Sequence, residues 1–425
     1  MAIEEVDARK LFNIILESKD LDFVCFAITP WHAIGVDAFV LDLSQQLRRR
    51  PKGIIVQIGH RRQGFIINEK NFVSNRFADA RFVKIQDKDF DLSVFLERKW
   101  VLAKFVLSLF RYLLWRLVFK VSGKKRKTLH FAYMVNPNIF SIVIFRSRDL
   151  SSRYVPVYHI LDEGLRSYLN PLWGWLMVRN LEQGNRPYRL SGEIERFLKD
   201  FLFGPLYYLF LSCLISRKKG SLFTSTSRLR AGKPDRKRVQ LYREVLAMRT
   251  ENLRRIAIPD YKRGIVILCT QPLSEAGIIS KEQEKSILSQ LLELIIEKME
   301  LSLIVKRHPR EDVKKYRELI ENVDRSSKIT FAEEPMSLED FLSRLDESSR
   351  PCAVIGYSSM ALITSKVIFN TPALSYFRIT SEYSNRNFWA RFSQPLPFDY
   401  LTRNLISFPR DLNEFECCLE KYCRK

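Results

Sequence analysis

The sequence predicts an α/β protein of two domains, each a parallel sheet between layers of helices, and three observations support this fold class. The chain has 425 residues, whereas a single hydrophobic core stops growing at about 250 to 300 residues. Its 46% hydrophobic and 28% charged residues indicate a globular protein, and a mean hydropathy of -0.16 argues against a polytopic membrane protein. Short apolar segments also alternate with longer amphipathic ones, which is typical of Rossmann-like domains.

The alternation begins in the first half of the chain, from residue 22 onward. The apolar runs "FVCFAIT" and "GIIVQIG" are predicted strands, and the amphipathic "WHAIGVDAFVLDLSQQLRRR" between them is a predicted helix. The run "YVPVYHI" is a further predicted strand, which follows larger insertions. We assign residues 1–258 to this N-terminal domain.

The alternation is clearer past residue 260. The predicted strands are "RGIVILCTQP", "LSLIVKRHP", "KITFAE", "CAVIGY" and "PALSYF", and the predicted helices between them are "SKEQEKSILSQLLELIIEKM", "EDVKKYRELIEN", "SLEDFLSRL" and "SSMALITSKVI". We place the domain boundary near Pro259, within the polar stretch "RTENLRRIAIPDYKRG", and assign residues 259–425 to the second domain. The last predicted helix, "DLNEFECCLEKYC", could pack back on the first domain.

Two segments of the first half, residues 99–127 and 197–219, are apolar and end in basic clusters. The first is interrupted by four cations, Lys104, Arg111, Arg116 and Lys120. The second contains Gly204-Pro205, and a transmembrane helix needs about 20 uninterrupted apolar residues, so we predict that neither segment spans a membrane. We expect amphipathic helices on an anionic membrane surface, and the alternative is that both are core helices.

The formal net charge of +22 predicts an acidic partner, which could be nucleic acid, an anionic membrane surface or a polyanionic substrate. We expect no nucleic-acid partner, because the chain has no recognisable binding module and its densest basic runs follow apolar helices. The N-terminal "MAIEEVDARKLFNIILESKD" lacks the basic start and apolar run of a secretory signal. We therefore expect a cytoplasmic protein, peripheral on the inner face of the cytoplasmic membrane.

The seven cysteines form an odd set, which we interpret as thiols in a reducing compartment. Four of them lie inside apolar stretches, where a free cysteine behaves as a small core residue: Cys25, Cys213, Cys269 and Cys352. The three near the C-terminus have no second Cys or His cluster beside them, so we expect no zinc site at Cys417, Cys418 and Cys423.

A pair of acids, Asp162 and Glu163, follows the predicted strand "YVPVYHI" and precedes Gly164. Ligands bind at the carboxyl ends of strands in open α/β sheets, so a carboxylate here could serve as a general base. The alternative is an acidic helix N-terminus, which the helix dipole would favour.

Two more motifs follow predicted strands in the second half. In "LIVKRHPRE", His308 lies just past a strand that Pro309 ends, and its imidazole could donate to a phosphate, although a lone loop histidine is more often a surface residue. In "VIGYSSMALI", Ser358 and Ser359 open a helix, whose N-terminus can bind an anion. The alternative is that Ser358 is simply an N-cap.

In this order, the three motifs resemble those of the bacterial sialyltransferases, including the lipooligosaccharide sialyltransferase and capsular polysialyltransferase families. "AITPWHAIGVDAF" is similar to the first strand-to-helix turn of these families, and "ILCTQPLSE" to the loop that opens their nucleotide domain. The resemblance runs from about residue 27 to residue 376, and the basic insertions and the C-terminal tail depart from it. It implies a GT-B glycosyltransferase fold, in which two Rossmann-like domains face each other across a cleft.

The resemblance also implies the catalytic groups. Either Asp162 or Glu163, on the N-terminal domain, would be the general base for the acceptor hydroxyl. His308 would donate a hydrogen bond or a proton to the phosphate of CMP as that group leaves. An oxocarbenium-like transition state is consistent with this division, because it needs a base on one face and stabilisation of the leaving group on the other.

The nucleotide-binding groups implied by the resemblance lie in the second domain. His308 and its neighbour Pro309 form the His-Pro motif. Ser358 and Ser359 would hold the phosphate of CMP from the helix N-terminus. Gln271 and Pro272 would line the nucleotide pocket.

The resemblance implies an inverting sialyltransferase, independent of metal and of any cofactor. It would move sialic acid from CMP-sialic acid to a cell-surface glycan or glycolipid, such as capsular polysaccharide, lipopolysaccharide or lipooligosaccharide. CMP-linked Kdo is an alternative donor, since Kdo transferases also carry His-Pro motifs. A basic nucleic-acid-binding protein is the alternative from another class.

The stretch "DKDFD", residues 87–91, has the Asp-x-Asp spacing that coordinates a metal in other glycosyltransferases. It lies in the first half, away from the predicted nucleotide domain, and directly precedes an amphipathic helix. We therefore interpret it as a helix start and expect no metal site.

Overall fold

The computed structural model describes residues 4–59, 69–86, 126–133, 153–161, 217–219, 221–223, 225–251, 253, 255–256, 264–275, 279–308, 311, 315–316, 328–332, 336–346, 349–382 and 398–423. The chain forms two compact units, residues 1–163 with 206–221, and residues 164–205 with 222–425.

The first unit contains a sheet of seven parallel strands in the order β1-β4-β3-β2-β5-β6-β7. The strands are β1 (Glu4–Glu5), β2 (Phe23–Ala27), β3 (Lys52–Gly59), β4 (Asp79–Gln86), β5 (Lys127–Tyr133), β6 (Tyr154–Ile160) and β7 (Arg217–Lys219). Counted from β2, the order from β4 to β7 is 3-2-1-4-5-6, which is that of a Rossmann fold. The strands predicted from "FVCFAIT", "GIIVQIG" and "YVPVYHI" are confirmed.

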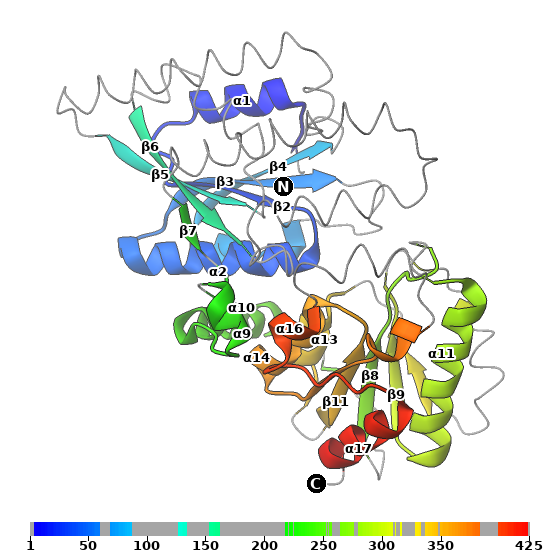
Figure 1. Ribbon diagram of the computed structural model, residues 1–425. Coiled ribbons are helices and arrows are strands. Elements are labelled where there is room, and N and C mark those ends of the chain that lie inside the picture. The colour runs from blue at the N-terminus through cyan, green and yellow to red at the C-terminus, as the bar shows by residue number, and fades with distance from the viewer. Residues whose placement is uncertain are drawn as a thin grey trace, which may run out of the picture. The chain divides into compact units, whose positions relative to one another are not determined.

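Helices cover both faces of this sheet, α1 (Ala8–Glu17) on one side and α2 (Pro30–Leu47) on the other (Figure 1). Successive residues of β2 belong to the two cores, because side chains alternate across a strand. Val24 packs in the core shared with α1, and Phe23 and Cys25 pack in the core shared with α2. A buried strand of a parallel sheet has apolar residues on both faces, which is why β2 is a continuous apolar run.

Two short 3-10 helices, η1 (Glu69–Asn71) and η2 (Ser74–Arg76), lie between β3 and β4. The carboxylate of Asp37, on α2, accepts the backbone N–H groups of Val73 and Ser74, each at 3.0 Å. Asp37 is fully buried, so these bonds compensate the burial of a charge and fix η2 against α2.

The second unit contains a sheet of five parallel strands in the order β10-β9-β8-β11-β12. The strands are β8 (Ile265–Cys269), β9 (Ser302–Lys306), β10 (Ile329–Phe331), β11 (Ala353–Gly356) and β12 (Ala373–Ser375). Counted from β8, the order is 3-2-1-4-5, so this sheet is also Rossmann-like. The α/β class and the two Rossmann-like units of the predicted GT-B fold are thus confirmed.

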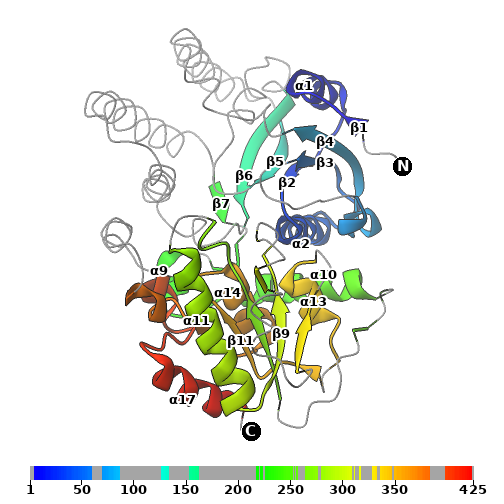
Figure 2. The same ribbon diagram turned by 90° about the vertical axis from the view of Figure 1, so that its right-hand side faces the viewer.

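The helices of the second unit again form two layers (Figure 2). One face carries α11 (Lys281–Glu293), which continues as the π-helical η5 (Leu294–Lys298), and α17 (Leu412–Cys423). The other face carries α10 (Arg236–Thr250), α13 (Leu338–Ser343) and α14 (Met360–Phe369). Short helices complete the unit: α9 (Thr226–Arg230), η7 (Ile379–Glu382) and α16 (Phe398–Thr402).

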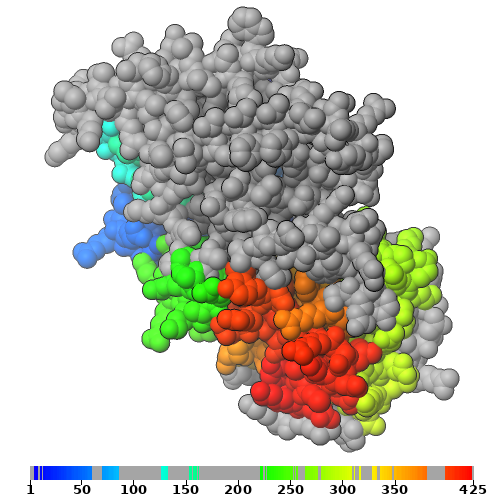
Figure 3. All heavy atoms as spheres, viewed as in Figure 1, coloured from blue at the N-terminus to red at the C-terminus, as the bar shows by residue number. Residues whose placement is uncertain are grey.

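The last helix, α17, packs in the core of the second unit, the domain to which the sequence analysis assigned it. Phe415 and Leu419 are fully buried in the core that contains β8, β9 and β11. Lys298, at the end of η5, pairs with Glu416 of α17. Residues 398–423 (red) accordingly lie beside α11 (yellow-green) on the molecular surface (Figure 3). The physical reason is the apolar stripe of α17, which completes this core.

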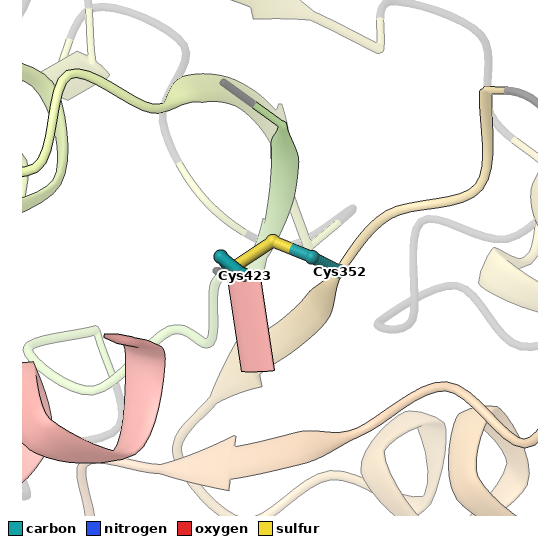
Figure 4. Close-up of a disulfide and its surroundings, with 2 residues drawn as sticks. All are labelled: Cys352 and Cys423. Atoms are coloured by element: carbon teal, nitrogen blue, oxygen red, sulfur yellow. A yellow bond between two sulfur atoms is a disulfide. The ribbon is translucent and has the colours of Figure 1, made fainter. Parts of the chain in front are cut away.

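Cys352 and Cys423 form a disulfide (Figure 4), which corrects the expectation that both are thiols. The bond links the residue before β11 to the end of α17. Disulfides persist in oxidising surroundings, so the cysteines no longer support the reducing compartment expected from the sequence. Cys25 and Cys269 are buried free thiols, as expected of core cysteines, and Cys417 and Cys418 are also free.

α9 and α10 belong to the second unit, which therefore begins earlier in the chain than the boundary expected near Pro259. Arg249 of α10 pairs with Asp340 of α13 at 2.8 Å, and both side chains are largely buried. Arg243 of α10 also donates to the carbonyl of Ile368, at 2.8 Å. These contacts tie α10 to the second sheet's helices.

The basic segment 99–127 lies outside the described residues except for its last two, and so does "DKDFD" at 87–91. Of the segment 197–219, only β7 is described. Among the helices that the structure describes, none combines the length and the apolar character needed to cross a membrane.

Candidate functional site

The predicted nucleotide-binding residues of the second unit lie at one edge of its sheet. Gln271 and Pro272 follow β8, His308 follows β9, and Ser358 and Ser359 follow β11. Because β9, β8 and β11 are adjacent and parallel, their carboxyl ends share this edge. The strand order reverses between β8 and β11, and ligands of open α/β sheets bind at such a switch point.

A hydrogen bond connects two of these residues across the switch point. The backbone N–H of Ser358 donates to Oε1 of Gln271, 2.8 Å away, although the two residues are 87 positions apart in the sequence. The hydroxyl of Ser358 lies 3.5 Å from the same oxygen. Gln271 therefore holds the turn that leads from β11 into α14.

Ser359 is the N-cap of α14, and its hydroxyl accepts the backbone N–H of Ala361 at 3.2 Å. The capping alternative weighed for Ser358 thus applies to its neighbour, while Ser358 precedes the cap. The arrangement puts the positive end of the helix dipole at the edge of the sheet where Gln271 lies. A helix N-terminus of this kind can bind an anion such as a phosphate.

His308 is half-buried, and its main chain is held at both polar groups. Its N–H donates to Oε2 of Glu311 at 2.8 Å and lies 3.2 Å from the hydroxyl of Thr270. Its carbonyl accepts the N–H of Glu311 at 3.0 Å. The turn after β9 is therefore closed by one acidic residue, and Pro309, the second member of the predicted motif, lies outside the described residues.

Glu311 is the centre of a buried polar cluster that the sequence did not reveal. Its side chain has no exposed surface, and its two oxygens accept the hydroxyls of Thr270 and Tyr316. Burial raises the pKa of Glu311, against the lowering effect of the hydrogen bonds from Thr270 and Tyr316.

Lys315 lies among three carboxylates, at 2.7 Å from Glu284, 3.3 Å from Glu311 and 3.5 Å from Glu275. The oxygens of these acids are close enough together to ligate a metal ion. In this structure the ammonium of Lys315 supplies the positive charge among them. Burial alone would lower the pKa of Lys315, but the hydrogen bond that Lys315 donates to Glu284 and the three negative charges outweigh it and raise that pKa.

The cations that precede His308 in the sequence bind main-chain carbonyls. Lys306 donates to the carbonyl of Met336 at 2.5 Å, and Arg307 donates to that of Glu311. Burial lowers the pKa of Lys306. Arg307 therefore stabilises the His308 turn itself, and Lys306 stabilises the segment that precedes α13.

In the first unit, the predicted bases Asp162 and Glu163 lie outside the described residues, whereas the strand before them is well defined. His159 of β6 packs on Phe39 of α2, and its Nε2 lies 2.9 Å from Nδ1 of His130 on β5. The residue just before the acids, Leu161, is buried in the core shared with α2. The described residues of this segment therefore end in a buried position, directly before the acidic pair in the sequence.

The turn after β2 is fixed by a reciprocal cap. The hydroxyl of Thr29 accepts the N–H of His32 at 3.3 Å, and Nδ1 of His32 accepts the N–H of Thr29 at 3.1 Å. Burial lowers the pKa of His32 to about 3, so the ring is neutral and can accept. This is the stretch "AITPWHAIGVDAF", whose histidine serves the local structure.

Sequence reasoning missed Glu311, Thr270 and the cluster around Lys315. The available signal was an acid three residues after His308 with a lysine four residues further on, a spacing typical of paired side chains on a helix. The pattern of "EDVKKYRELIEN" predicts only a covering helix. Its first residue, Glu311, is buried instead, and it accepts hydrogen bonds from donors in the turns after β8 and β9.

Comparison with solved structures finds remote likenesses. The UDP-GlcNAc 2-epimerase of Methanocaldococcus jannaschii is 12% identical, with a TM-score of 0.44 over 95% of this chain and 92% of that one. A putative UDP-N-acetylglucosamine 2-epimerase of Listeria monocytogenes is 9% identical, with a TM-score of 0.40 over 91% and 89%. TcCGT1 in complex with UDP is 12% identical, with a TM-score of 0.42 over 96% and 90%. No curated protein matches the chain.

The family model described as alpha-2,8-polysialyltransferase (POLYST) matches residues 25–378. The match spans more than half of the chain and includes every predicted site residue, the acidic pair, the His-Pro motif and the Ser-Ser motif among them. The chain belongs to the alpha-2,8-polysialyltransferase family, and it is accordingly a glycosyltransferase.

Proposed function

We propose that this enzyme is an inverting, metal-independent sialyltransferase that moves sialic acid from CMP-sialic acid to a cell-surface glycan. The acceptor would be a capsular polysaccharide, a lipopolysaccharide or a lipooligosaccharide. One observation carries the proposal: Gln271, His308 and Ser358 meet at the carboxyl edge of the second sheet, where its strand order reverses. Nucleotides bind at this place in Rossmann-like folds.

The phosphate of CMP would bind at the N-terminus of α14. The helix dipole favours a negative charge there, and the hydroxyl of Ser358 and the main chain of the turn supply hydrogen-bond donors. The imidazole of His308 would donate to the same phosphate from the neighbouring turn. Stabilisation of the leaving group by these donors would replace the metal ion that nucleotide diphosphate donors need, which supports metal independence.

The acceptor hydroxyl would react at the anomeric carbon of sialic acid. Asp162 or Glu163 would accept the hydroxyl proton as the oxygen forms the new glycosidic bond. The bond between the anomeric carbon and the phosphate oxygen would break on the opposite face, and CMP would leave with its charge stabilised by His308. Attack and departure on opposite faces invert the configuration.

The net charge of +22 supports an anionic acceptor and an anionic membrane surface beside it. A growing glycan of sialic acid residues carries a negative charge on each residue, and basic segments would hold it. We propose a peripheral location on the inner face of the cytoplasmic membrane, which keeps the enzyme beside a lipid-linked acceptor. This location requires the Cys352–Cys423 disulfide to persist against the reductants of the cytoplasm.

The test is a transfer assay in the presence of EDTA. Purified protein is incubated with labelled CMP-sialic acid and a panel of galactosides and oligosialic acids, with CMP-Kdo in a parallel series. We expect transfer from CMP-sialic acid, and the His308→Ala variant should lose it while keeping its fold, because a loop residue contributes little to the core. Absence of both transfer and donor hydrolysis would refute the function, and activity with CMP-Kdo alone would change the donor.

A further inference from the structure

Glu311 is a buried carboxylate whose position has a cost. Its side chain has no exposed surface, and burying an ionised carboxylate is unfavourable unless hydrogen bonds compensate it. The compensation comes from the N–H of His308, the hydroxyls of Thr270 and Tyr316, and the ammonium of Lys315. An apolar residue could fill the same space without the unfavourable burial of a charge. We therefore explain the carboxylate by the groups whose positions its hydrogen bonds fix.

What Glu311 holds is the main chain of His308. Oε2 accepts the N–H of His308 at 2.8 Å, and the N–H of Glu311 donates to the carbonyl of His308 at 3.0 Å. Both backbone torsions of residue 308 are thereby restrained, and the direction of its Cα–Cβ bond is fixed. The imidazole then reaches a ligand only through its two side-chain torsions, from a fixed Cβ position.

The same carboxylate joins this turn to the other half of the site. Oε2 also accepts the hydroxyl of Thr270 at 2.5 Å, and the next residue, Gln271, accepts the N–H of Ser358 at 2.8 Å. A continuous series of contacts therefore runs from His308 through Glu311, Thr270 and Gln271 to Ser358. It spans the three strand ends that would surround the phosphate.

The second oxygen of Glu311 is anchored away from the site. Oε1 accepts the hydroxyl of Tyr316 at 2.5 Å and lies 3.3 Å from Nζ of Lys315. Lys315 in turn pairs with Glu284 of α11. The carboxylate of Glu311 is therefore connected, through Lys315, to a helix of the layer that covers the sheet. This anchoring leaves Glu311 one orientation.

We propose that Glu311 is a positioning residue, which sets His308 at the distance from Ser358 that the leaving phosphate requires. The proposal rests on the sialyltransferase function proposed above and adds a residue to its machinery. Glu311 touches neither donor nor acceptor and acts through His308. Misplacement of a reacting group by about 1 Å can cost roughly 100-fold in rate, so loss of the carboxylate should reduce turnover strongly.

The experiment compares Glu311→Ala, Glu311→Gln and Asp340→Asn with the wild-type enzyme. Asp340 is the matched control, since it is a largely buried carboxylate of the same unit. Among the described residues its oxygens accept hydrogen bonds from Arg249 and Ser337, whereas those of Glu311 accept from the His308 turn. Calorimetric titration with CMP counts the folded binding sites in each preparation, and kcat is expressed per site. This correction removes the effect of partial unfolding.

We expect Glu311→Ala to lower kcat per site about 100-fold, while KM for the donor changes by about threefold or less. Glu311→Gln keeps an oxygen that can accept the N–H of His308, so it should restore kcat to within about tenfold of the wild type. Asp340→Asn should keep its kcat per site. If Glu311→Ala does not fold, the test rests on Glu311→Gln. The proposal then requires the kcat of Glu311→Gln to be higher than the kcat of His308→Ala, and an equal or lower value would overturn it.

The double variant His308→Ala/Glu311→Ala gives a readout that a merely structural role would not produce. If Glu311 acts through His308, the second substitution costs nothing further once His308 is lost. Additive losses would overturn the proposal, and so would an unchanged kcat in Glu311→Ala or an equal loss in Asp340→Asn. A wild-type enzyme without transfer or donor hydrolysis refutes the proposed function itself, which distinguishes the two failures.

Discussion

We expect the Asp22→Asn variant to lose about 2 kcal/mol of unfolding free energy at neutral pH. The Asp22 side chain is 4% exposed and accepts two bonds from Arg49, at 2.6 and 2.8 Å, and one from the N–H of Lys52 at 2.8 Å. Lys127 lies 3.0 Å from the same carboxylate. Breaking a buried pair costs about 3–5 kcal/mol, but Arg49 and Lys127 are 49% and 33% exposed, so water offsets part of the loss.

The loss should depend on pH in a defined direction. Burial alone would raise the pKa of Asp22, but the hydrogen bonds from Arg49, Lys52 and Lys127 outweigh it and lower that pKa in the folded protein. A carboxyl group whose folded pKa is depressed stabilises the fold above its unfolded pKa, about 4, and this contribution is lost as pH falls through the folded pKa. The difference between wild type and variant should therefore be full at neutral pH and shrink below about pH 4.

Urea denaturation followed by circular dichroism at a series of pH values would measure this difference. Glu4→Gln is the control, because Glu4 also pairs with an arginine, Arg81 at 2.7 Å, but its side chain is 37% exposed. Its denaturation midpoint should stay at the wild-type value. A constant difference between Asp22→Asn and wild type across the whole pH range would refute the electrostatic origin of the effect.

Three further outcomes are expected. Gly53→Ala should lower the unfolding free energy by about 1–3 kcal/mol in urea denaturation, because the added Cβ would lie 2.5 Å from ring atoms of Phe23; a wild-type midpoint would contradict this contact. Asp162→Asn and Glu163→Gln should differ in activity. One of them should lose transfer yet still bind CMP by calorimetry, because the base acts only on the acceptor. Full activity in both variants would exclude the acidic pair as the base. The enzyme should co-sediment with anionic vesicles, because each cation near such a surface contributes about 1 kcal/mol. The sedimented fraction should fall as salt rises, and fall strongly when residues 124–127 are replaced by Ser or Gln. Recovery of the protein in the supernatant at low salt would contradict membrane binding.

The sequence predicted β2 and β8, which are buried on both faces, but not β4 and β5, which have polar positions. β2 and β8 have apolar side chains toward both helix layers, so each is a recognisable apolar run. β4, "DARFVKIQ", and β5, "KTLHFAY", carry charged and polar residues among their apolar ones. A parallel strand of this composition is defined by its neighbours in the sheet, which the sequence does not display.

The positions of the candidate site residues at strand ends were predictable from the sequence, but the hydrogen bonds between these residues were not. Gln271, His308 and Ser358 each follow an apolar run, so their places at strand ends could be inferred locally. The bond from Ser358 to Gln271 spans 87 residues, and that from Thr270 to Glu311 spans 41. Such contacts depend on strand order, and the disulfide between Cys352 and Cys423 depends on it in the same way.

That disulfide changes the covalent topology of the enzyme. Cys352 and Cys423 are separated by 71 residues, and the closed ring they form contains β11, α14, β12 and α17. Ser358 and Ser359 therefore lie inside a covalent loop. A single protease cut anywhere between the two cysteines would leave both fragments joined on a non-reducing gel, and they would separate only after a reductant opens the ring.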